Sequence, residues 1–358
     1  MARRKARIPQ GKKLQPAVKD LVFSLNVGGI GITTNDYVSL SQVASIVNRR
    51  FYRAGLNWAV AGIEFITPGP YTGEITISKV PDTWVASNAY EKSLRTWLKM
   101  NREALDETES IKPKFLDFKV FMDADHHAAG VGANLLPLGV GGTAATAGEW
   151  AMSTIHVPYA TDVTNSGFDS MREFDLIWTG ASFPGAGASG NDAVSLIEGY
   201  AASRGLPDIL DPNAPDDAAD SVGATPENWM TAVFNEGTTQ SHEVVEDLLS
   251  ENNLAPYPFE GATVGGVTFA DTQYPGGANQ LPGPQIFDNV KMTNSTVGAK
   301  AYVPGTNFQG GLIKISNTPL QYPLPNGELT NAFGSVAMII RLVPGPHRGY
   351  MCQDQKDV

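Results

Sequence analysis

The chain has 358 residues, a net charge of -11 and a pI near 4.9. Its single cysteine, Cys352, excludes an intrachain disulfide and a cysteine-based metal site, and no stretch reaches the ~18 apolar residues of a membrane span. Gly (37) and Pro (24) are frequent, whereas charged residues, at 18%, fall below the usual ~25%. This composition favours short strands joined by turns and a surface that packs against copies of itself.

The N-terminal segment, residues 1–19, differs in charge from the rest of the chain. It holds seven Lys or Arg and no acid, so the remaining residues carry 19 basic against 37 acidic side chains, a net charge of -18. The scarcity of large apolar groups and the breaks at Pro9, Gly11 and Pro16 predict a disordered arm. Cations on a flexible segment bind polyanions by releasing counterions. The residues expected to contact nucleic acid are Arg3, Arg4, Lys5, Arg7, Lys12 and Lys13.

The first part of the body alternates in the manner of β-strands. Strands are expected at residues 21–27, 56–67, 73–80 and 114–122. Helical spacing predicts a helix over 39–55, with Gly55 as its C-terminal cap. A longer helix is expected over 83–107, where apolar residues make one stripe after Pro81.

The middle and the end of the chain differ in character. Further strands are expected at residues 150–157, 172–183, 286–290, 297–303 and 311–316. Helices are expected at 192–204, 226–234 and 241–252. An acidic loop, 207–220, separates the first two of these helices. The most apolar run, 335–343, is short and β-branched and is followed by PGP, which predicts a buried strand.

These elements predict the fold class. Strands do not alternate with helices, which argues against a doubly wound parallel sheet. Strong strands at both ends indicate one β domain whose chain leaves for a helical excursion and returns. We therefore expect a mainly β protein, a single antiparallel jelly-roll β-sandwich with helical insertions and a disordered basic N-terminal arm. The arm is residues 1–19, and the shell domain is 20–358 with a helical and loop insertion at about 186–284.

One stretch, MDADHHAAG, offers metal-binding chemistry. Asp123, Asp125, His126 and His127 follow an expected strand, and on a strand positions 123 and 125 share a face, so two carboxylates could converge on a cation. These residues define one alternative function, a metal-dependent hydrolase. A polar turn after a strand has the same composition, and the other histidines lie in unrelated segments. We favour the turn and expect no metal and no cofactor.

Other candidate sites are weaker. The acidic loop 207–220 lacks EF-hand spacing. A low-affinity calcium site in this loop is kept as an alternative to a solvated loop. No nucleophile elbow or phosphate-binding lysine motif is present in the sequence, so we expect no enzymatic activity. The segment NRRFYR, residues 48–53, mixes arginines with Phe51 and Tyr52 and could combine base stacking with phosphate contacts. We favour the simpler interpretation, arginines that complement a helix dipole.

Several stretches resemble the coat proteins of small circular single-stranded DNA viruses that encode a replication initiator. They are SIVNRRFYRAG, SLIEGYAASRGLPDILDP, YPGGANQLPG and the ending LVPGPHRGYMC. The resemblance spans most of the chain, although none of the stretches is a diagnostic motif. The basic arm is shorter than in many such coats.

The resemblance implies a structural protein. Many copies of a single jelly-roll subunit would assemble into an icosahedral shell, with the arm directed inward onto a packaged genome, here single-stranded DNA. The implied location is the virion, and the nucleus of the host cell during assembly, since a short basic run also serves nuclear import. The resemblance also implies a host receptor, whose identity it does not give. We expect no membrane partner.

Three points stay open at the level of sequence. A carbohydrate-binding β-sandwich module with an incidental, solubilising basic tail is a further alternative function. An electrostatic arm reads neither base nor sugar, so residues alone do not separate a DNA genome from an RNA genome. The number of copies in the shell is also undetermined.

Overall fold

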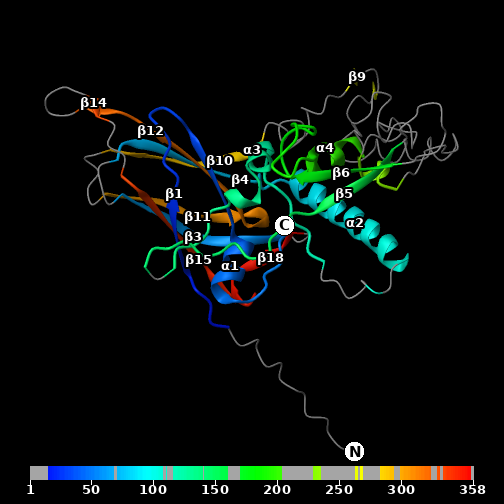
Figure 1. The fold of residues 1–358 in the computed structure, drawn as a ribbon, viewed down its shortest axis with the longest axis horizontal. Helices are drawn as coiled ribbons and strands as arrows, with labels where there is room; N and C mark the ends of the chain where they lie inside the picture. The colour runs from blue at the N-terminus through cyan, green and yellow to red at the C-terminus, as the bar shows by residue number, and fades with distance from the viewer. Residues whose placement is uncertain are drawn as a thin grey trace, which may run out of the picture.

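Strands from the two ends of the chain lie side by side in the computed structural model (Figure 1). The structure describes residues 15–67, 71–107, 110, 116–139, 141–159, 170–203, 229–234, 263–264, 267–268, 283–293, 299–323, 329–330 and 334–355. These residues form a β-sandwich and a smaller unit of helices and strands beside it (Figure 1).

Two antiparallel sheets make the sandwich. One contains, in spatial order, β1 (Asp20–Leu25), β15 (Val336–Leu342), β3 (Leu56–Ile66) and β11 (Lys300–Phe308), and β18 (Cys352–Asp354) also pairs with β3. The other contains β10 (Gln285–Met292), β4 (Gly73–Lys79), β12 (Leu312–Pro319) and β2 (Thr34–Ser39). Every pairing in these sheets joins a strand before residue 80 to one after residue 284. This interleaving is the strand order of a jelly roll, and the predicted fold class is confirmed.

Period-two burial explains why these residues form strands. In β15, Val336, Met338, Ile340 and Leu342 are buried, and the residues between them are half-buried or exposed. The buried strand expected at 335–343 is therefore present as β15, with one fully buried face and a second face that is half-buried or exposed. The core between the sheets draws on both of them, with Phe65 from β3 and Ile313 from β12 among its fully buried members.

The chain leaves the sandwich after β4 and returns at β10. The excursion contains α2 (Trp84–Glu107), α3 (Ala124–Ala129), η2 (Val131–Ala133), β5 (Thr154–Tyr159), β6 (Ser170–Ile177), β7 (Asp192–Ser195), α4 (Leu196–Ala202), α5 (Trp229–Ala232), β8 (Thr263–Val264) and β9 (Val267–Thr268). It begins near residue 80 and not near 186, because β5 pairs with β6, and β6 pairs with β7, in a sheet separate from the sandwich. Period-two patterns identify strands but not the sheet that they join.

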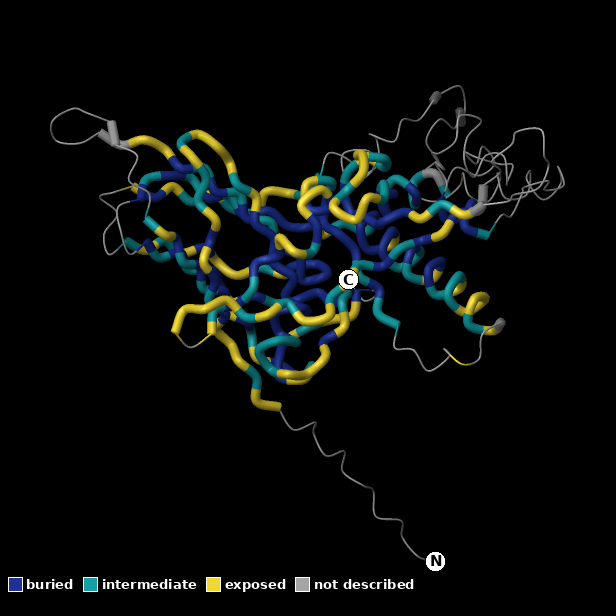
Figure 2. Tube along the Cα trace, viewed as in Figure 1, coloured by how far each residue is buried: buried dark blue, intermediate teal, exposed yellow. Residues whose placement is uncertain are grey.

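A second core lies under α2. Its buried members include Trp97 and Ala86 from this helix, Phe174 from β6 and Trp229 from α5. Tyr37 of β2 belongs to the same cluster, so the two cores meet at the sandwich wall. Figure 2 shows the buried segments gathered in the centre of the molecule, where the sandwich and the excursion adjoin.

The excursion also covers one edge of the sandwich. The Leu135 amide donates to the Tyr37 carbonyl at 2.7 Å, and the Leu138 amide donates to the Val22 carbonyl at 2.7 Å. These bonds occupy backbone groups of β2 and β1, the outermost strands of the two sheets on this side. Covering edge strands in this way suppresses unwanted strand pairing.

Several expected elements differ in the structure. The half-buried strand expected at 114–122 is extended chain over its described part, and only Phe121 forms a bridge, with Ile177. The helix expected at 192–204 is a strand followed by a helix, β7 and α4. The helix expected at 226–234 corresponds to the shorter helix α5, residues 229–232. The helix expected at 241–252 lies outside the described residues.

The remaining short elements connect the sandwich strands. They are α1 (Leu40–Asn48), η7 (Gln309–Gly311), β13 (Tyr322–Pro323), β14 (Leu329–Thr330), β16 (Pro344–Gly345) and β17 (Gly349–Tyr350). Of these, α1 joins β2 to β3 and lies at the end of the sandwich from which the N-terminal chain departs (Figure 1).

The alternation in β15 gives a matched test of the sandwich core. Ile340 is buried completely, whereas its neighbour Ile339 is half-buried on the opposite face. We predict that Ile340→Ala lowers the free energy of unfolding by about 2–5 kcal/mol, because it leaves a cavity. Ile339→Ala is the control and is expected to cost clearly less in the same denaturant titration. Equal losses would contradict the assignment of the two faces.

Candidate nucleic-acid interface

The six cations predicted to contact nucleic acid precede the described chain. Arg3, Arg4, Lys5, Arg7, Lys12 and Lys13 all lie outside the described residues, which begin at Gln15. The structure does place residues 15–19, which we call the arm root. Its position fixes the end of the sandwich from which the basic segment starts.

The arm root is held by residues from both halves of the chain. The Val18 amide donates to Asn48 Oδ1 at 3.1 Å, and the Tyr350 hydroxyl donates to the Val18 carbonyl at 2.6 Å. Asn48 Nδ2 in turn donates to the Tyr350 oxygen at 2.7 Å. The Leu342 amide donates to the Lys19 carbonyl at 2.9 Å, which continues the β15 pairing toward the root. These bonds attach the arm root to the C-terminal end of α1.

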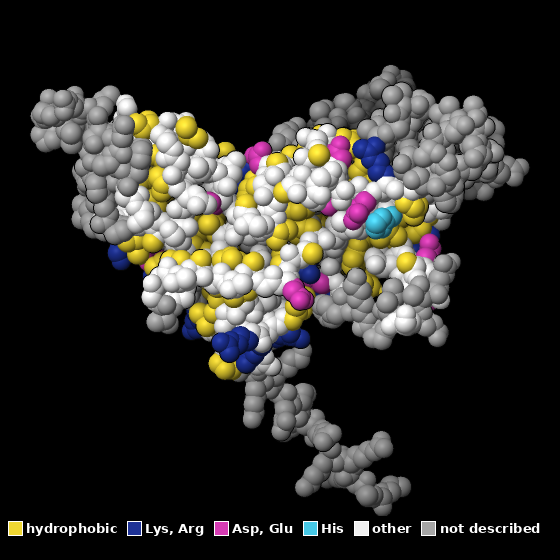
Figure 3. All heavy atoms as spheres, in the orientation of Figure 1, with side chains coloured by type: hydrophobic (Ala, Val, Ile, Leu, Met, Phe, Trp, Pro, Cys, Tyr) yellow, Lys and Arg dark blue, Asp and Glu magenta, His cyan; other side chains and the backbone are white. Residues whose placement is uncertain are grey.

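Exposed cations surround this attachment. We call Lys19, Arg49, Arg50, Phe51 and Arg348 the basic rim; all five are exposed. Arg50 Nη1 donates to Gln15 Oε1 and to the Pro16 carbonyl, both at 3.3 Å, so this arginine reaches the arm root itself. Figure 3 shows Lys and Arg side chains gathered at the end of the molecule where the chain leaves toward its N-terminus.

The arginine segment begins where α1 ends. A helix was expected to continue to a cap at Gly55, but α1 ends at Asn48 and Arg49 is its left-handed cap, with φ 52° and ψ 39°. No basic residue lies in the last turn of α1. Gly55 does have a positive φ of 75°, in the turn before β3, where a Cβ would overlap the Tyr90 ring. Residues 49–55 are therefore a turn in which the three arginines and Phe51 are exposed, whereas Tyr52 is buried.

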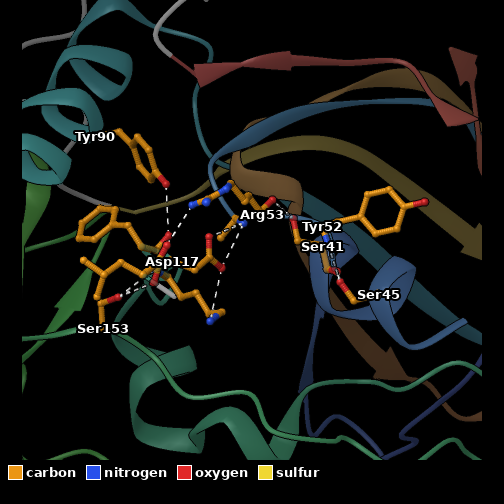
Figure 4. A network of polar contacts seen from close by, with 11 residues as sticks. Ser41, Ser45, Tyr52, Arg53, Tyr90, Asp117 and Ser153 are labelled. Carbon is orange, nitrogen blue, oxygen red and sulfur yellow. Dashed lines mark hydrogen bonds and ion pairs between the residues drawn. The ribbon is translucent and has the colours of Figure 1, made fainter. Parts of the chain in front are cut away.

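A hydrogen-bond network fixes this turn (Figure 4). Ser45 Oγ accepts the Tyr52 amide at 2.9 Å, and Ser41 Oγ donates to the Arg53 carbonyl at 3.0 Å. Arg53 Nη1 donates to the Leu116 carbonyl at 2.9 Å, which ties the turn to the extended chain of the excursion. The arginines are thus mounted on an ordered backbone.

Tyr52 connects the turn to the C-terminal part of the chain. Its side chain is buried, and its hydroxyl donates to the Arg348 carbonyl at 3.0 Å. The Arg348 guanidinium donates back to the Phe51 carbonyl. Burial raises the pKa of the Tyr52 hydroxyl, although the positive charges of Arg50 and Arg348 act in the opposite direction. Tyr52 is therefore a neutral hydrogen-bond donor that holds Arg348 beside Phe51.

Asp117 braces the turn from the other side (Figure 4). Its carboxylate accepts the Ala54 amide at 3.3 Å and pairs with Lys119 Nζ at 3.3 Å. Burial raises the pKa of this carboxyl, and Lys119 partly offsets the rise. The Lys119 ammonium lies 5.8 Å from the Phe51 ring centroid and 4.6 Å from that of Trp150. A further cation, Lys119, and a second aromatic ring, Trp150, therefore lie close to Phe51 of the basic rim.

The metal-capable residues of MDADHHAAG have a different role. Asp123 is the N-cap of α3, and its Oδ1 accepts the His126 amide at 2.9 Å and the Tyr37 hydroxyl at 2.8 Å. Lys314 Nζ lies 2.7 Å from Asp123 Oδ2 and 2.8 Å from Asp125 Oδ2. Burial lowers the pKa of Lys314, but hydrogen bonds and charge from both aspartates outweigh it, so the net shift is upward. The two carboxylates do converge on one cation, and that cation is a lysine of β12.

The two histidines point to different partners. His126 Nδ1 accepts the Met122 amide at 3.1 Å, so Nε2 carries the proton and donates to Asn134 Oδ1 at 2.7 Å. Burial lowers the pKa of His126 to about 4. His127 Nε2 instead lies 3.0 Å from Asp175 Oδ2 in the excursion sheet. Together with Lys314, these contacts form a polar junction between the sandwich and the excursion.

This arrangement does not favour metal chemistry at the junction. Asp123, His126 and His127 are buried, and each bonds to protein groups. Over the described ranges, no group of three or more His, Cys, Asp or Glu side chains is placed to hold a metal ion. The acidic loop 207–220, the other cation-binding candidate, lies outside the described residues.

Arg348 was not identified as a site residue from the sequence. It joins the rim because the C-terminal strands return to α1, about 300 residues away along the chain, and no local pattern marks that contact. Lys19 was counted with the arm but not assigned a contact. Within the described part of the chain, no helix combines the length and the apolar character needed to cross a membrane.

Comparisons with protein-family models, with curated proteins and with solved structures found no match to this chain.

The buried His126 predicts a pH dependence of stability. Since its pKa is about 4 in the folded protein and near 6.5 when unfolded, the unfolded chain binds an extra proton between these values. Its contribution is lost as the pH falls through this window, by up to about 3 kcal/mol. We predict that His126→Asn flattens the unfolding free energy between pH 6.5 and 4. His156→Asn, at an exposed strand position, is the control. A slope unchanged by His126→Asn would refute this assignment.

Proposed function

We propose that this chain is the coat protein of a small icosahedral virus. Many copies assemble into a closed shell that encloses the nucleic-acid genome, and the subunit has no enzymatic role. The observation that carries the proposal is the combination of a jelly-roll sandwich with a basic arm whose root lies inside a rim of exposed cations. A surface that concentrates positive charge at one end suits a subunit with one face toward a polyanion.

Self-assembly accounts for the charge distribution. Seven cations in the first 19 residues are few for one chain, but closed symmetry directs all copies of that end toward one interior. The remaining residues carry a net charge of -18, which keeps finished shells apart in solution. The low charged fraction of 18% suits extensive contacts between subunits.

The partners follow from this role. They are other copies of the chain, and a genome that the family resemblance makes single-stranded DNA. The arm cations Arg3, Arg4, Lys5, Arg7, Lys12 and Lys13 contact it without base specificity. The protein belongs to the virion, and its basic segment suits passage to the host nucleus during assembly.

The competing functions have less support. A metal-dependent hydrolase would need Asp123, Asp125, His126 and His127 around one open coordination position. Asp123 and Asp125 instead pair with Lys314, and the histidines bond to Asn134 and Asp175. A carbohydrate-binding module would leave the basic rim without a function.

Assembly is the first test. The purified protein is expected to elute far ahead of a 38.2 kDa monomer in size exclusion and to show closed particles by negative-stain microscopy. Such particles follow from symmetric closure of one repeated interface. A monomer that persists across salt concentration and pH would rule out the coat function.

The arm cations are tested at constant chain length. Replacing all six by glutamine is expected to leave the thermal unfolding temperature unchanged, because the segment has little apolar surface to bury. The nucleic-acid content of nuclease-treated particles is expected to fall. Six phosphate contacts contribute about -4 to the slope of log K against log salt for single strands. In the glutamine variant, we expect this slope to be less negative by about 4. Unchanged nucleic-acid content would contradict the role given to the arm.

A further inference from the structure

Two arginines of the basic rim have backbone conformations that L residues rarely adopt. The φ angle is 52° at Arg49 and 49° at Arg348, and Phe183 and Ala299 are the other non-glycine residues with positive φ in the described ranges. Glycine adopts this conformation without steric cost. Such strain persists where surrounding structure imposes it, and it concentrates at functional sites. The choice of arginine over glycine at both positions points to a use for the two side chains.

The charge of the rim is not neutralised locally. Arg49, Arg50 and Arg348 form no ion pair with a carboxylate within the part of the chain that the structure describes. Two exposed arginines elsewhere do: Arg95 pairs with Glu91 at 2.8 Å, and Arg341 pairs with Glu64 at 2.5 Å. Cations that are not ion-paired within the protein can bind anions without first breaking such a pair.

An exposed aromatic ring lies among these cations. Phe51 is 38% exposed although it stands next to the fully buried Tyr52. The guanidinium of Arg348 bonds to the Phe51 carbonyl. Ser45 holds the backbone on either side of Phe51, since its carbonyl accepts the Arg50 amide at 3.3 Å and its Oγ accepts the Tyr52 amide at 2.9 Å. An aromatic face on an ordered backbone, flanked by arginines, is the arrangement with which proteins stack unpaired bases.

We propose that the basic rim is a second, structured site for single-stranded nucleic acid. Arg49, Arg50 and Arg348 contact phosphates, and Phe51 stacks on a base. This inference rests on the proposed function and extends it, since it gives the folded body a part in holding the genome beside the arm. A duplex keeps its bases stacked inside and offers Phe51 no face, so the rim distinguishes single strands from duplex.

A helix-dipole role does not account for the rim as a whole. Arg49 is the cap of α1 and its charge does favour the helix end. Arg348 comes from the turn between β16 and β17 and belongs to no helix. A dipole role also needs no exposed phenylalanine, so binding of a ligand explains more of the rim.

Arg49→Gly separates binding from folding. Glycine relieves the positive φ at this position, so the unfolding temperature is expected to stay unchanged or rise. Binding of a fluorescent oligothymidylate to the unassembled fraction is expected to weaken several-fold. The slope of log K against log salt is expected to become less negative by about 0.7, because one phosphate contact is lost. The experiment uses the full chain, with and without the six arm cations replaced by glutamine. The double replacement Arg95→Gln/Arg102→Gln on α2 is the control for loss of charge.

Phe51→Leu tests stacking. It is expected to weaken binding of the single strand about fivefold or more and to leave binding of a duplex of equal length unchanged. Equal weakening for both ligands, or none for either, would overturn the stacking role. An unchanged salt slope for Arg49→Gly in the arm-neutralised protein would overturn the site.

The two proposals fail in distinguishable ways. Absence of closed particles counts against the coat function, whatever the rim binds. Particles that form and package, combined with rim variants that bind oligothymidylate like the α2 control, count against the rim alone.

Discussion

The pairing of the first strands with the last strands is the constraint on which the rest of this structure depends. Because β1 pairs with β15 and β3 pairs with both β15 and β11, neither end of the chain can complete a sheet of the sandwich alone. Loop closure across more than 200 residues precedes the core contacts, which makes folding slow in principle. The same pairing brings the β16–β17 turn to the end of α1. The basic rim is a direct consequence, since its arginines come from both ends of the sequence.

The excursion between β4 and β10 is attached to the sandwich by two kinds of contact. Apolar contacts join Tyr37 and Leu312 of the sandwich to the core under α2. The polar junction adds directional bonds, with Lys314 of β12 between two aspartates of α3 and its cap. Asp123 is buried and Lys314 is largely shielded from solvent, so leaving either charge unpaired would be costly. Their pairing therefore favours one orientation of the two units. A subunit of defined shape is what repeated assembly requires.

Local patterns in the sequence predicted the elements well where burial follows a simple period. The strands β3, β4 and β15 and the long helix α2 were all expected within a few residues, because their apolar positions repeat at two or at 3.6 residues. The strand β2, TNDYVS, was missed because its polar residues are buried through tertiary contacts, as in Asp36, which accepts bonds from Asn26. Its carboxyl pKa is raised by burial, and Asn26 offsets part of that rise.

The candidate site was predicted in part. The segment with Arg49, Arg50 and Phe51 was noticed, but its helix was expected to run on to Gly55, which would have spread the arginines around a cylinder. Arg348 could not be found, since its place in the rim depends on pairing between distant strands. For MDADHHAAG, a polar turn was favoured over two strand carboxylates that converge on a cation. The structure shows the N-terminal cap and first turn of a short helix, with Asp123 and Asp125 facing Lys314.

A cryo-electron microscopy reconstruction of purified particles tests the central claim most directly, because it shows both closure of the shell and the orientation of its subunits. The account predicts a closed shell in which α1 and the turn with Arg348 line the inner surface, with nucleic-acid density against Phe51. A shell with this end of the sandwich on its outer surface, or an assembly with no enclosed interior, would contradict it.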